Sequence, residues 1–177
     1  MMAAIPVIET ERLRLRAPVM ADFDAYAAMW ADQRVTAYIG GNPRTRNESW
    51  ARFIGMHGLW ALCGYGYWLF ADRHTDALIG VGGLASFERG LPDIDGVPEA
   101  GWAMAPDAWG RGLATEAMAA VLDWSDTVLK APIVRCIIDP GHTASEKVAA
   151  KLGFVPFGRG DLDGHPVNIH GRPGRLP

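Results

Sequence analysis

The chain has 177 residues, of which 49% are hydrophobic and 21% charged, and its formal net charge is -3. This length suits one domain with a well-buried core and is short for two. The acidic balance argues against a general nucleic-acid binder, no apolar run reaches the roughly 20 residues that span a bilayer, and the N-terminus lacks a signal-peptide pattern.

The two cysteines, Cys63 and Cys136, lie far apart in the sequence. Their spacing fits neither a metal cluster nor a disulfide framework. We therefore expect a cytoplasmic protein without a metal site. The net charge and the absence of a long apolar run further lead us to expect no nucleic-acid partner and no membrane partner.

The first part of the chain combines one strand pattern with two helix patterns. Residues 10–16 predict a half-buried strand, because arginine and leucine alternate over residues 12–16. An apolar stripe at helical spacing over residues 23–30 predicts a short amphipathic helix. A capping box formed by Thr45 and Glu48 predicts a second helix, which Gly64 ends.

Three further strands are predicted before the middle of the chain, over residues 65–71, 77–87 and 98–105. A polar turn joins the first two, and a loop rich in turn formers precedes the third. Glycines interrupt the middle strand and predict a bulge or a close approach by other backbone: Gly80, Gly82 and Gly83.

A glycine-rich motif then opens what the pattern predicts to be the longest helix, with Val128 on its apolar side and Pro132 at its end. Residues 133–138 form an apolar run broken only by Arg135, which predicts a strand buried on both faces. Thr143 and Glu146 form a second capping box, at the start of the last helix.

The end of the chain predicts two strands, residues 154–157 and 167–170, joined through a turn at Asp163-Gly164. Residues 171–177 are rich in Gly, Pro and Arg and predict a loose tail. Residues 1–177 thus form one domain, with a core of about residues 9–170. The order of elements predicts a mixed α/β (α+β) fold, a single sheet flanked by helices.

The most informative run is Trp109-Gly110-Arg111-Gly112-Leu113-Ala114-Thr115-Glu116-Ala117. A helix start exposes unpaired N–H groups, and glycines there let a phosphate approach them. A Walker loop would need Lys-Ser/Thr after Gly112, and a dinucleotide fingerprint would need a small residue at Thr115. Neither pattern fits, which leaves a diphosphate seat built from main chain or a glycine-rich helix start without a ligand.

The order of this motif, a buried strand and a helix ending in Ala-Lys-Leu-Gly-Phe resembles the GNAT family of acetyl-coenzyme A-dependent N-acyltransferases. The opening Thr-Glu-Arg-Leu-Arg-Leu-Arg strand resembles its RimJ/RimL-type branch. The resemblance implies a mostly antiparallel sheet of about six or seven strands, splayed between two parallel strands and flanked by about four helices. It covers residues 9 to about 170.

The resemblance also implies an N-acetyltransferase that moves an acetyl group from acetyl-coenzyme A to a primary amine in a ternary complex. The coenzyme pyrophosphate would bind the glycine motif: Trp109, Gly110, Arg111, Gly112, Leu113, Ala114 and Thr115. The pantetheine arm would lie between strands 98–105 and 133–138. The N–H of Met104 would stabilise the developing oxyanion.

Two positions depart from the family pattern. His142 stands where many members carry Asn, and Ala149 stands where many carry the tyrosine that protonates the leaving thiolate. The resemblance to the RimJ/RimL-type branch implies that Ser145 donates this proton instead. Ser145 is also compatible with a bond to local backbone, and His142 with either a contact to the coenzyme or an exposed loop position.

Three further residues bear on the chemistry of the site. Glu99 is compatible with a proton relay from the attacking amine or with a charged strand edge. We expect Arg111 to contact the diphosphate, because a guanidinium beside it makes charge-assisted hydrogen bonds. Cys136 lies among apolar residues, where a thiolate is disfavoured, so we do not expect a nucleophile there.

The acceptor amine is open at this point. The resemblance implies a protein N-terminus or a small-molecule amine, and either a monomer or a homodimer. Because the usual tyrosine and asparagine are both replaced, a non-catalytic acyl-coenzyme A sensor or interaction domain stays as the alternative.

Overall fold

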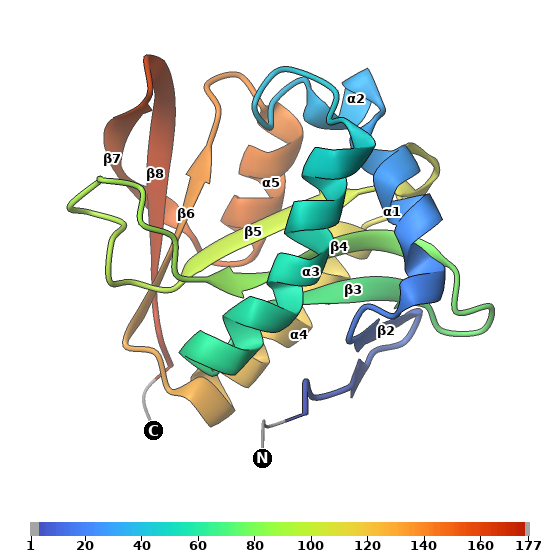
Figure 1. Cartoon of the computed structure of the whole chain (residues 1–177). Helices are drawn as coiled ribbons and strands as arrows, with labels where there is room; N and C mark the ends of the chain where they lie inside the picture. The colour runs from blue at the N-terminus through green and yellow to red at the C-terminus, as the bar shows by residue number, and fades with distance from the viewer. Residues whose placement is uncertain (1–3, 176–177) are drawn as a thin grey trace.

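One eight-stranded sheet, in the order β1-β2-β3-β4-β5-β6-β8-β7, runs through the computed structural model, which describes residues 4–175 (Figure 1). The strands are β1 (Ile8–Glu9), β2 (Leu13–Arg16), β3 (Tyr67–Asp72), β4 (Leu78–Ala85), β5 (Glu99–Met104), β6 (Ile133–Ile138), β7 (Val155–Leu162) and β8 (His165–Pro173). The α-helices are α1 (Phe23–Trp30), α2 (Gln33–Thr36), α3 (Arg46–Cys63), α4 (Leu113–Trp124) and α5 (Thr143–Lys151).

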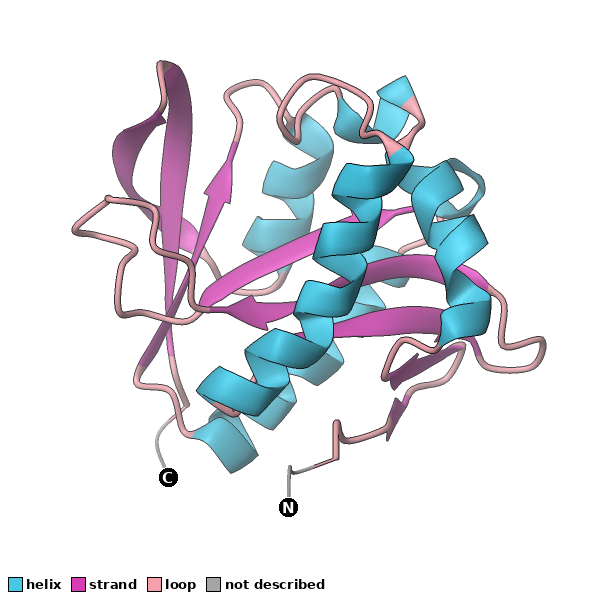
Figure 2. Ribbon diagram, in the orientation of Figure 1, coloured by secondary structure: helices cyan, strands magenta, loops and turns pink. Residues whose placement is uncertain are grey.

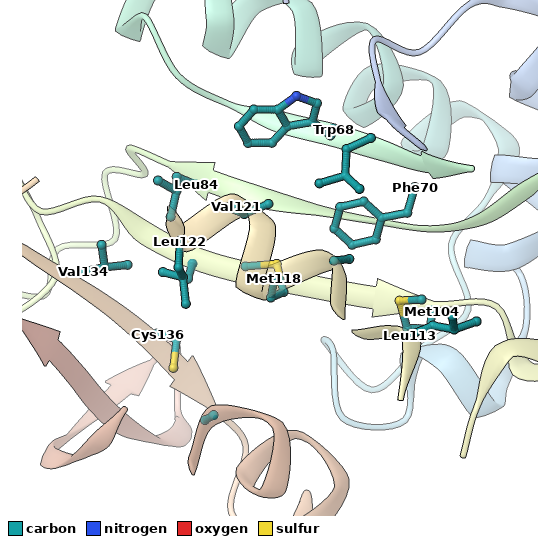
Figure 3. Close-up of a cluster of buried hydrophobic side chains, with 14 of the residues drawn as sticks. Trp68, Phe70, Leu84, Met104, Leu113, Met118, Val121, Leu122, Val134 and Cys136 are labelled. Atoms are coloured by element: carbon teal, nitrogen blue, oxygen red, sulfur yellow. The ribbon is translucent and has the colours of Figure 1, made fainter. Parts of the chain in front are cut away.

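Helices cover both faces of the sheet, as Figure 2 shows. On one face, α1 and α3 pack with Val81 of β4 and Ala103 of β5. On the other face, α4 contributes Met118, Val121 and Leu122 to a larger cluster with the aromatic side chains of β3 (Figure 3). The predicted mixed fold with a single flanked sheet is confirmed.

All neighbouring strands are antiparallel except β5 and β6. This parallel pair is joined at one register position, Glu99 opposite Arg135, and the two strands then diverge (Figure 1). The predicted splay between two parallel strands is therefore present. It leaves the C-terminal half of β5 without a partner on its β6 side.

The capping box at Thr45 and Glu48 is confirmed: Thr45 accepts from the N–H of Glu48, whose carboxylate accepts from the N–H of Thr45. The second predicted capping box is wrong. His142 is the N-cap of α5, so Thr143 is already the first helical residue and makes no cap bond. The sequence pattern was shifted by one residue from the true helix start.

Helix lengths and burial near α4 also differ from the prediction. The longest helix is α3, with 18 residues, whereas α4 has 12 and continues as a π-helical segment, Ser125–Leu129. This wider turn breaks the helical spacing of the apolar side chains, and Val128 is exposed.

β6 is buried on one face rather than two. Val134, Cys136 and Ile138 are buried, whereas Arg135 lies on the opposite face and stacks on the ring of Phe157 in β7. The splay exposes part of this face, and the hairpin formed by β7 and β8 covers another part.

The C-terminal hairpin is longer than predicted. The turn at Asp163 and Gly164 is confirmed, with both residues at positive φ (54° and 86°), a geometry that keeps the strands paired. β8 continues to Pro173, so the predicted loose tail is wrong for residues 171–173. Residues 176–177 of that tail lie outside the described part of the chain.

A buried ion pair fixes this C-terminal strand to the π-helical segment that follows α4. The guanidinium of Arg172 donates to both carboxylate oxygens of Asp126 (3.0 and 2.7 Å), and both side chains are over nine-tenths buried. Hydrogen bonds from Arg172 lower the pKa of Asp126 and outweigh its burial.

We expect Asp126→Asn to lower the free energy of unfolding by about 3 kcal/mol, because it leaves the buried charge of Arg172 unpaired. In the unaltered protein this stability is present above the ordinary pKa of an aspartate and is lost as pH falls through the lowered pKa. Urea denaturation at neutral and acid pH measures both effects. The exposed Asp123→Asn is the matched control, and an equal loss in both variants would contradict the assignment.

None of the helices within residues 4–175 has the length and apolar character needed to cross a membrane.

Candidate active site

The glycine motif forms an exposed loop between β5 and α4. Gly110 and Gly112 adopt positive φ (73° and 74°), and Gly112 is the N-cap of α4. Within the described residues, the backbone N–H groups of residues 110–115 have no hydrogen-bond acceptor. A Cβ added at Gly110 would meet no atom within 4 Å, and one at Gly112 only the Arg12 guanidinium at 3.8 Å, so the surface of the loop is open to an anion. The loop therefore fits a diphosphate, which needs several N–H donors at a helix start.

Arg12 of the segment before β2 supports this loop. Its guanidinium donates to the C=O of Arg111 (2.9 Å) and pairs with Glu116 in the first turn of α4 (2.6 Å). Burial alone would raise the pKa of Glu116, but hydrogen bonds from Thr10 and Arg12 outweigh it and lower that pKa. Arg12 thus offsets the negative charge of Glu116 in the first turn of α4. The side chain of Arg111 is exposed and makes no hydrogen bond to the described residues.

Met104 lies at the open edge of β5. The N–H of Ala105 donates to the C=O of Ile79 in β4 (2.9 Å). Because N–H groups alternate along a strand, the N–H of Met104 faces the other way, into the splay. The indole Nε1 of Trp109 donates to the C=O of Met104 (2.9 Å), which ties the glycine loop to this edge.

A cleft of about 980 Å³ crosses the molecule at the splay. Its walls come from α1, the α2–α3 loop and α3 on one side, and from the end of β6 and the start of α5 on the other. Trp102 and Glu99 of β5, with His142 and Ser145, are among the residues that line it. Residues 109–115 do not line this cleft, but Trp109 ties the glycine loop to Met104, the neighbour of the cleft residue Ala103.

Ser145 and His142 lie together at the start of α5. The Oγ of Ser145 is 3.4 Å from the Nε2 of His142, and the ring of His142 stacks on Tyr38 (4.5 Å between ring centres). Burial lowers the pKa of His142, against the opposing charges of Asp139 and Glu146. The imidazole is therefore neutral at neutral pH, and it is a half-buried cleft residue, not an exposed loop histidine.

Ala149, at the position of the missing tyrosine, is fully buried in the core around α4 and brings no polar group to the cleft. The cleft instead contains phenols from elsewhere in the chain, including Tyr38 and Tyr67. Sequence patterns did not identify them, because Tyr38 is in a loop and Tyr67 looks like an ordinary strand residue. The hydroxyl of Tyr67 occupies the space beside Gly101 that a side chain would fill.

Glu99 is buried, not at a solvated edge. Both its carboxylate oxygens accept from Arg89 (2.9 and 2.7 Å). Burial opposes the charge of Arg89, but the hydrogen bonds and charge of Glu99 outweigh it and raise the pKa of Arg89. Arg89 thus engages both carboxylate oxygens, and this pairing limits the proton-relay interpretation.

Cys136 is buried, and desolvation raises the pKa of its thiol. A buried thiol with a raised pKa is a poor nucleophile, which agrees with the prediction from the sequence. Within residues 4–175, no group of three or more His, Cys, Asp or Glu side chains is arranged to hold a metal ion.

Comparisons with known proteins agree with this geometry. A family model described as an acetyltransferase (GNAT) domain matches residues 12–155. An uncharacterized N-acetyltransferase, p20, from Bacillus licheniformis is 29% identical over 150 residues, which cover 84% of this chain and 82% of that protein. The acetyltransferase from Agrobacterium tumefaciens strain C58 has a crystal structure with a TM-score of 0.83 and 28% identity, covering 97% of this chain and 96% of that one.

A more distant structure is RimL, the ribosomal L7/L12 alpha-N-protein acetyltransferase, in complex with coenzyme A. Its TM-score is 0.78 at 17% identity, over 97% of this chain and 100% of that one. At this identity the likeness establishes the shared fold.

Proposed function

This chain belongs to the GNAT family of acetyltransferases, and from that premise we propose that the whole chain is one N-acetyltransferase domain acting on a primary amine. Acetyl-coenzyme A supplies the acetyl group as an activated thioester, which the neutral amine attacks directly. The observation that carries this proposal is the set of open N–H groups at residues 110–115, beside a cleft that reaches the splayed strands.

The coenzyme would be bound by main-chain N–H groups and by the guanidinium of Arg111. The N–H groups of residues 110–115 would bind the diphosphate, and the guanidinium of Arg111 would add a charge-assisted hydrogen bond. The N–H of Met104 would face the acetyl carbonyl and stabilise its developing negative charge. His142 lines the same cleft and would contact the pantetheine arm.

Ser145 would hold the proton for the leaving thiolate at its Oγ. Its place in the first turn of α5 puts it at the positive end of that helix, which also stabilises a nearby thiolate. The neutral Nε2 of His142 would orient the hydroxyl. Tyr38 would keep the imidazole ring in place by stacking on it.

Glu99 would act on the amine side of the cleft. Because Arg89 donates to both of its carboxylate oxygens, we propose that Glu99 positions the amine or a water that takes its proton. The hydroxyl of Tyr67, from β3, lies beside Gly101, which is on the same face of β5 as Glu99.

We expect kcat/KM to rise with pH from neutral into the alkaline range, because the acceptor must lose a proton before it attacks. The rise should be about tenfold per pH unit below the pKa of the amine, which is near 8 for α-amines and near 10.4 for lysine. Initial rates with one acceptor of each kind measure this profile. Profiles that are flat from neutral pH upward with both acceptors would contradict direct attack by a neutral amine.

The decisive functional experiment is an amine screen with acetyl-coenzyme A, read out by thiol release. Peptides with free N-termini and small-molecule amines form its two arms, since RimL is named for acetylation of a protein α-amine. Amine-dependent thiol release supports the proposal. Coenzyme binding without release in either arm would support the sensor alternative, which no observation in the structure favours.

We propose, as the sequence predicts, a cytoplasmic protein that is a monomer or a homodimer. The proposal for the compartment rests on Cys63 and Cys136, which form no disulfide.

A further inference from the structure

Two arginines lie over one tryptophan in the cleft. The guanidinium of Arg44, just before α3, is 4.8 Å from the ring centre of Trp30, and that of Arg52, in α3, is 5.9 Å from it. All three residues line the wall of the cleft that α1 and α3 provide. Arg44 and Arg52 are separated from Trp30 by turn and helix residues, so no local sequence pattern brings the three together.

Neither guanidinium has a carboxylate partner within residues 4–175, whereas Arg46 pairs with Asp24 and Arg89 with Glu99. The Nε of Arg44 is buried without a hydrogen-bond acceptor, and its Nη2 reaches only the C=O of Ile39, at 3.4 Å. Arg44 is half-buried, and the only hydrogen bond that its guanidinium makes to the described residues is this long one from Nη2. Arg44 therefore has guanidinium donors left for a ligand.

The charges of the two arginines act on the cleft and on each other. Burial lowers the pKa of Arg44, and the positive charge of Arg52 lowers it further, against smaller opposing effects of Tyr26 and Glu48. Arg52 also lowers the pKa of the phenols of Tyr26 and Tyr67, against the larger effect of their burial, so its charge reaches well into the cleft. The half-buried Arg44 therefore lies beside a second positive charge, and a bound anion would offset the cost of this repulsion.

The arginine pair lies close to the proposed reaction centre. Trp30 packs in the same cluster as Val81 of β4 and Ala103 of β5. Ala103 precedes Met104, whose N–H faces the splay. A small molecule that fills this cleft can thus reach the splay and the arginines together.

We propose that Arg44 and Arg52 bind a carboxylate on the acceptor, so that the substrate is a small amine that carries a negative group. This inference rests on the proposed function for the amine, but the anion site itself does not. The arginines supply several donors for a carboxylate, and their charge disfavours polyamines, whose second cation would lie beside them.

The first experiment measures binding of glutarate, a dicarboxylate without an amine, to the full chain by calorimetry, with the neutral glutaramide as reference. We expect glutarate to bind and glutaramide to bind at least about tenfold more weakly, since charge-assisted hydrogen bonds are lost. Arg44→Gln/Arg52→Gln should remove the difference. The single Arg52→Gln alters an exposed residue and should reduce the difference without affecting folding.

Arg46→Gln is the matched control, because Arg46 lies between the two arginines in sequence but pairs with Asp24 outside the cleft. It should keep the preference for glutarate. Equal binding of glutarate and glutaramide to the unaltered protein, or a preference that survives in the double variant, would overturn the proposal.

The second experiment compares acetyl transfer to ω-amino acids of increasing length with transfer to their carboxamides. The acids should be better substrates by about tenfold in kcat/KM, mainly through KM, and the double variant should lose this preference. Faster transfer to aminoalkyl phosphates than to the acids, or to polyamines, would contradict the carboxylate assignment. If no amine reacts while glutarate binding depends on the arginines, the proposed function fails and the anion site stands.

Discussion

Gly112→Val should weaken coenzyme A binding by about a hundredfold, which corresponds to about 3 kcal/mol, or the loss of one or two charge-assisted hydrogen bonds. Gly112 is the N-cap of α4 at φ 74°, where a β-branched residue is strained. The added side chain would also stand among the open N–H groups of residues 110–115. Calorimetric titration with coenzyme A measures the effect directly.

Backbone strain alone must be separated from loss of the binding site. Gly64, at the end of α3, has almost the same φ (75°) and open space around it, and it lies far from the loop in the sequence. Gly64→Val should therefore lower stability without changing coenzyme affinity. If it weakens binding as much as Gly112→Val does, or if Gly112→Val binds normally, the loop is not the diphosphate site.

Ser145→Ala should lower kcat by about a hundredfold, the usual size of the contribution from a positioned proton donor. The hydroxyl lies 3.4 Å from His142 Nε2 in the cleft, and Ala149 leaves the tyrosine position without a polar group. Affinity for coenzyme A should stay unchanged, because the loop at residues 109–115 is not altered. Steady-state thiol release and calorimetry together separate the two effects.

Thr143→Ala is the matched control for this prediction. Thr143 is in the same first turn of α5, is exposed, and makes no side-chain hydrogen bond within the described residues. The variant should keep its kcat. A Ser145→Ala enzyme with nearly full kcat would assign the proton to another group, and Tyr38 would be the next residue to test.

Local patterns were sufficient to predict the parts of this fold that depend on neighbours in sequence. The capping box at Thr45, the helix end at Gly64 and the hairpin turn at Asp163 and Gly164 each depend on a few adjacent residues. The resemblance to the GNAT family placed the splay between β5 and β6, which no local pattern reveals.

Features that depend on tertiary context were missed or misplaced. Val128 is exposed because a π-helical segment changes the register, which its apolar neighbours do not signal. The second capping box failed because the Thr-Glu spacing also occurs one residue inside a helix. Residues 171–173 looked like a tail, yet pairing with β6 and the Arg172–Asp126 ion pair order them.

In the candidate site, too, local patterns predict some residues, and others are found only in the folded protein. The glycine motif and Ser145 could be selected from sequence, because their positions match a family pattern. The pairing of Arg89 with Glu99 and the stacking of Tyr38 on His142 join residues that are not adjacent in the chain. Arg44 and Arg52 share a ligand-facing position only because both lie over Trp30 in the folded protein.

The most direct measurement is a calorimetric titration of the unaltered protein with coenzyme A and, in parallel, with pantetheine, which lacks the diphosphate. If main-chain amides at the start of α4 grip that group, coenzyme A binds to one site per chain and pantetheine binds at least about a hundredfold more weakly. Equal affinities for the two compounds, or no heat and no thermal stabilisation with coenzyme A, would contradict the account.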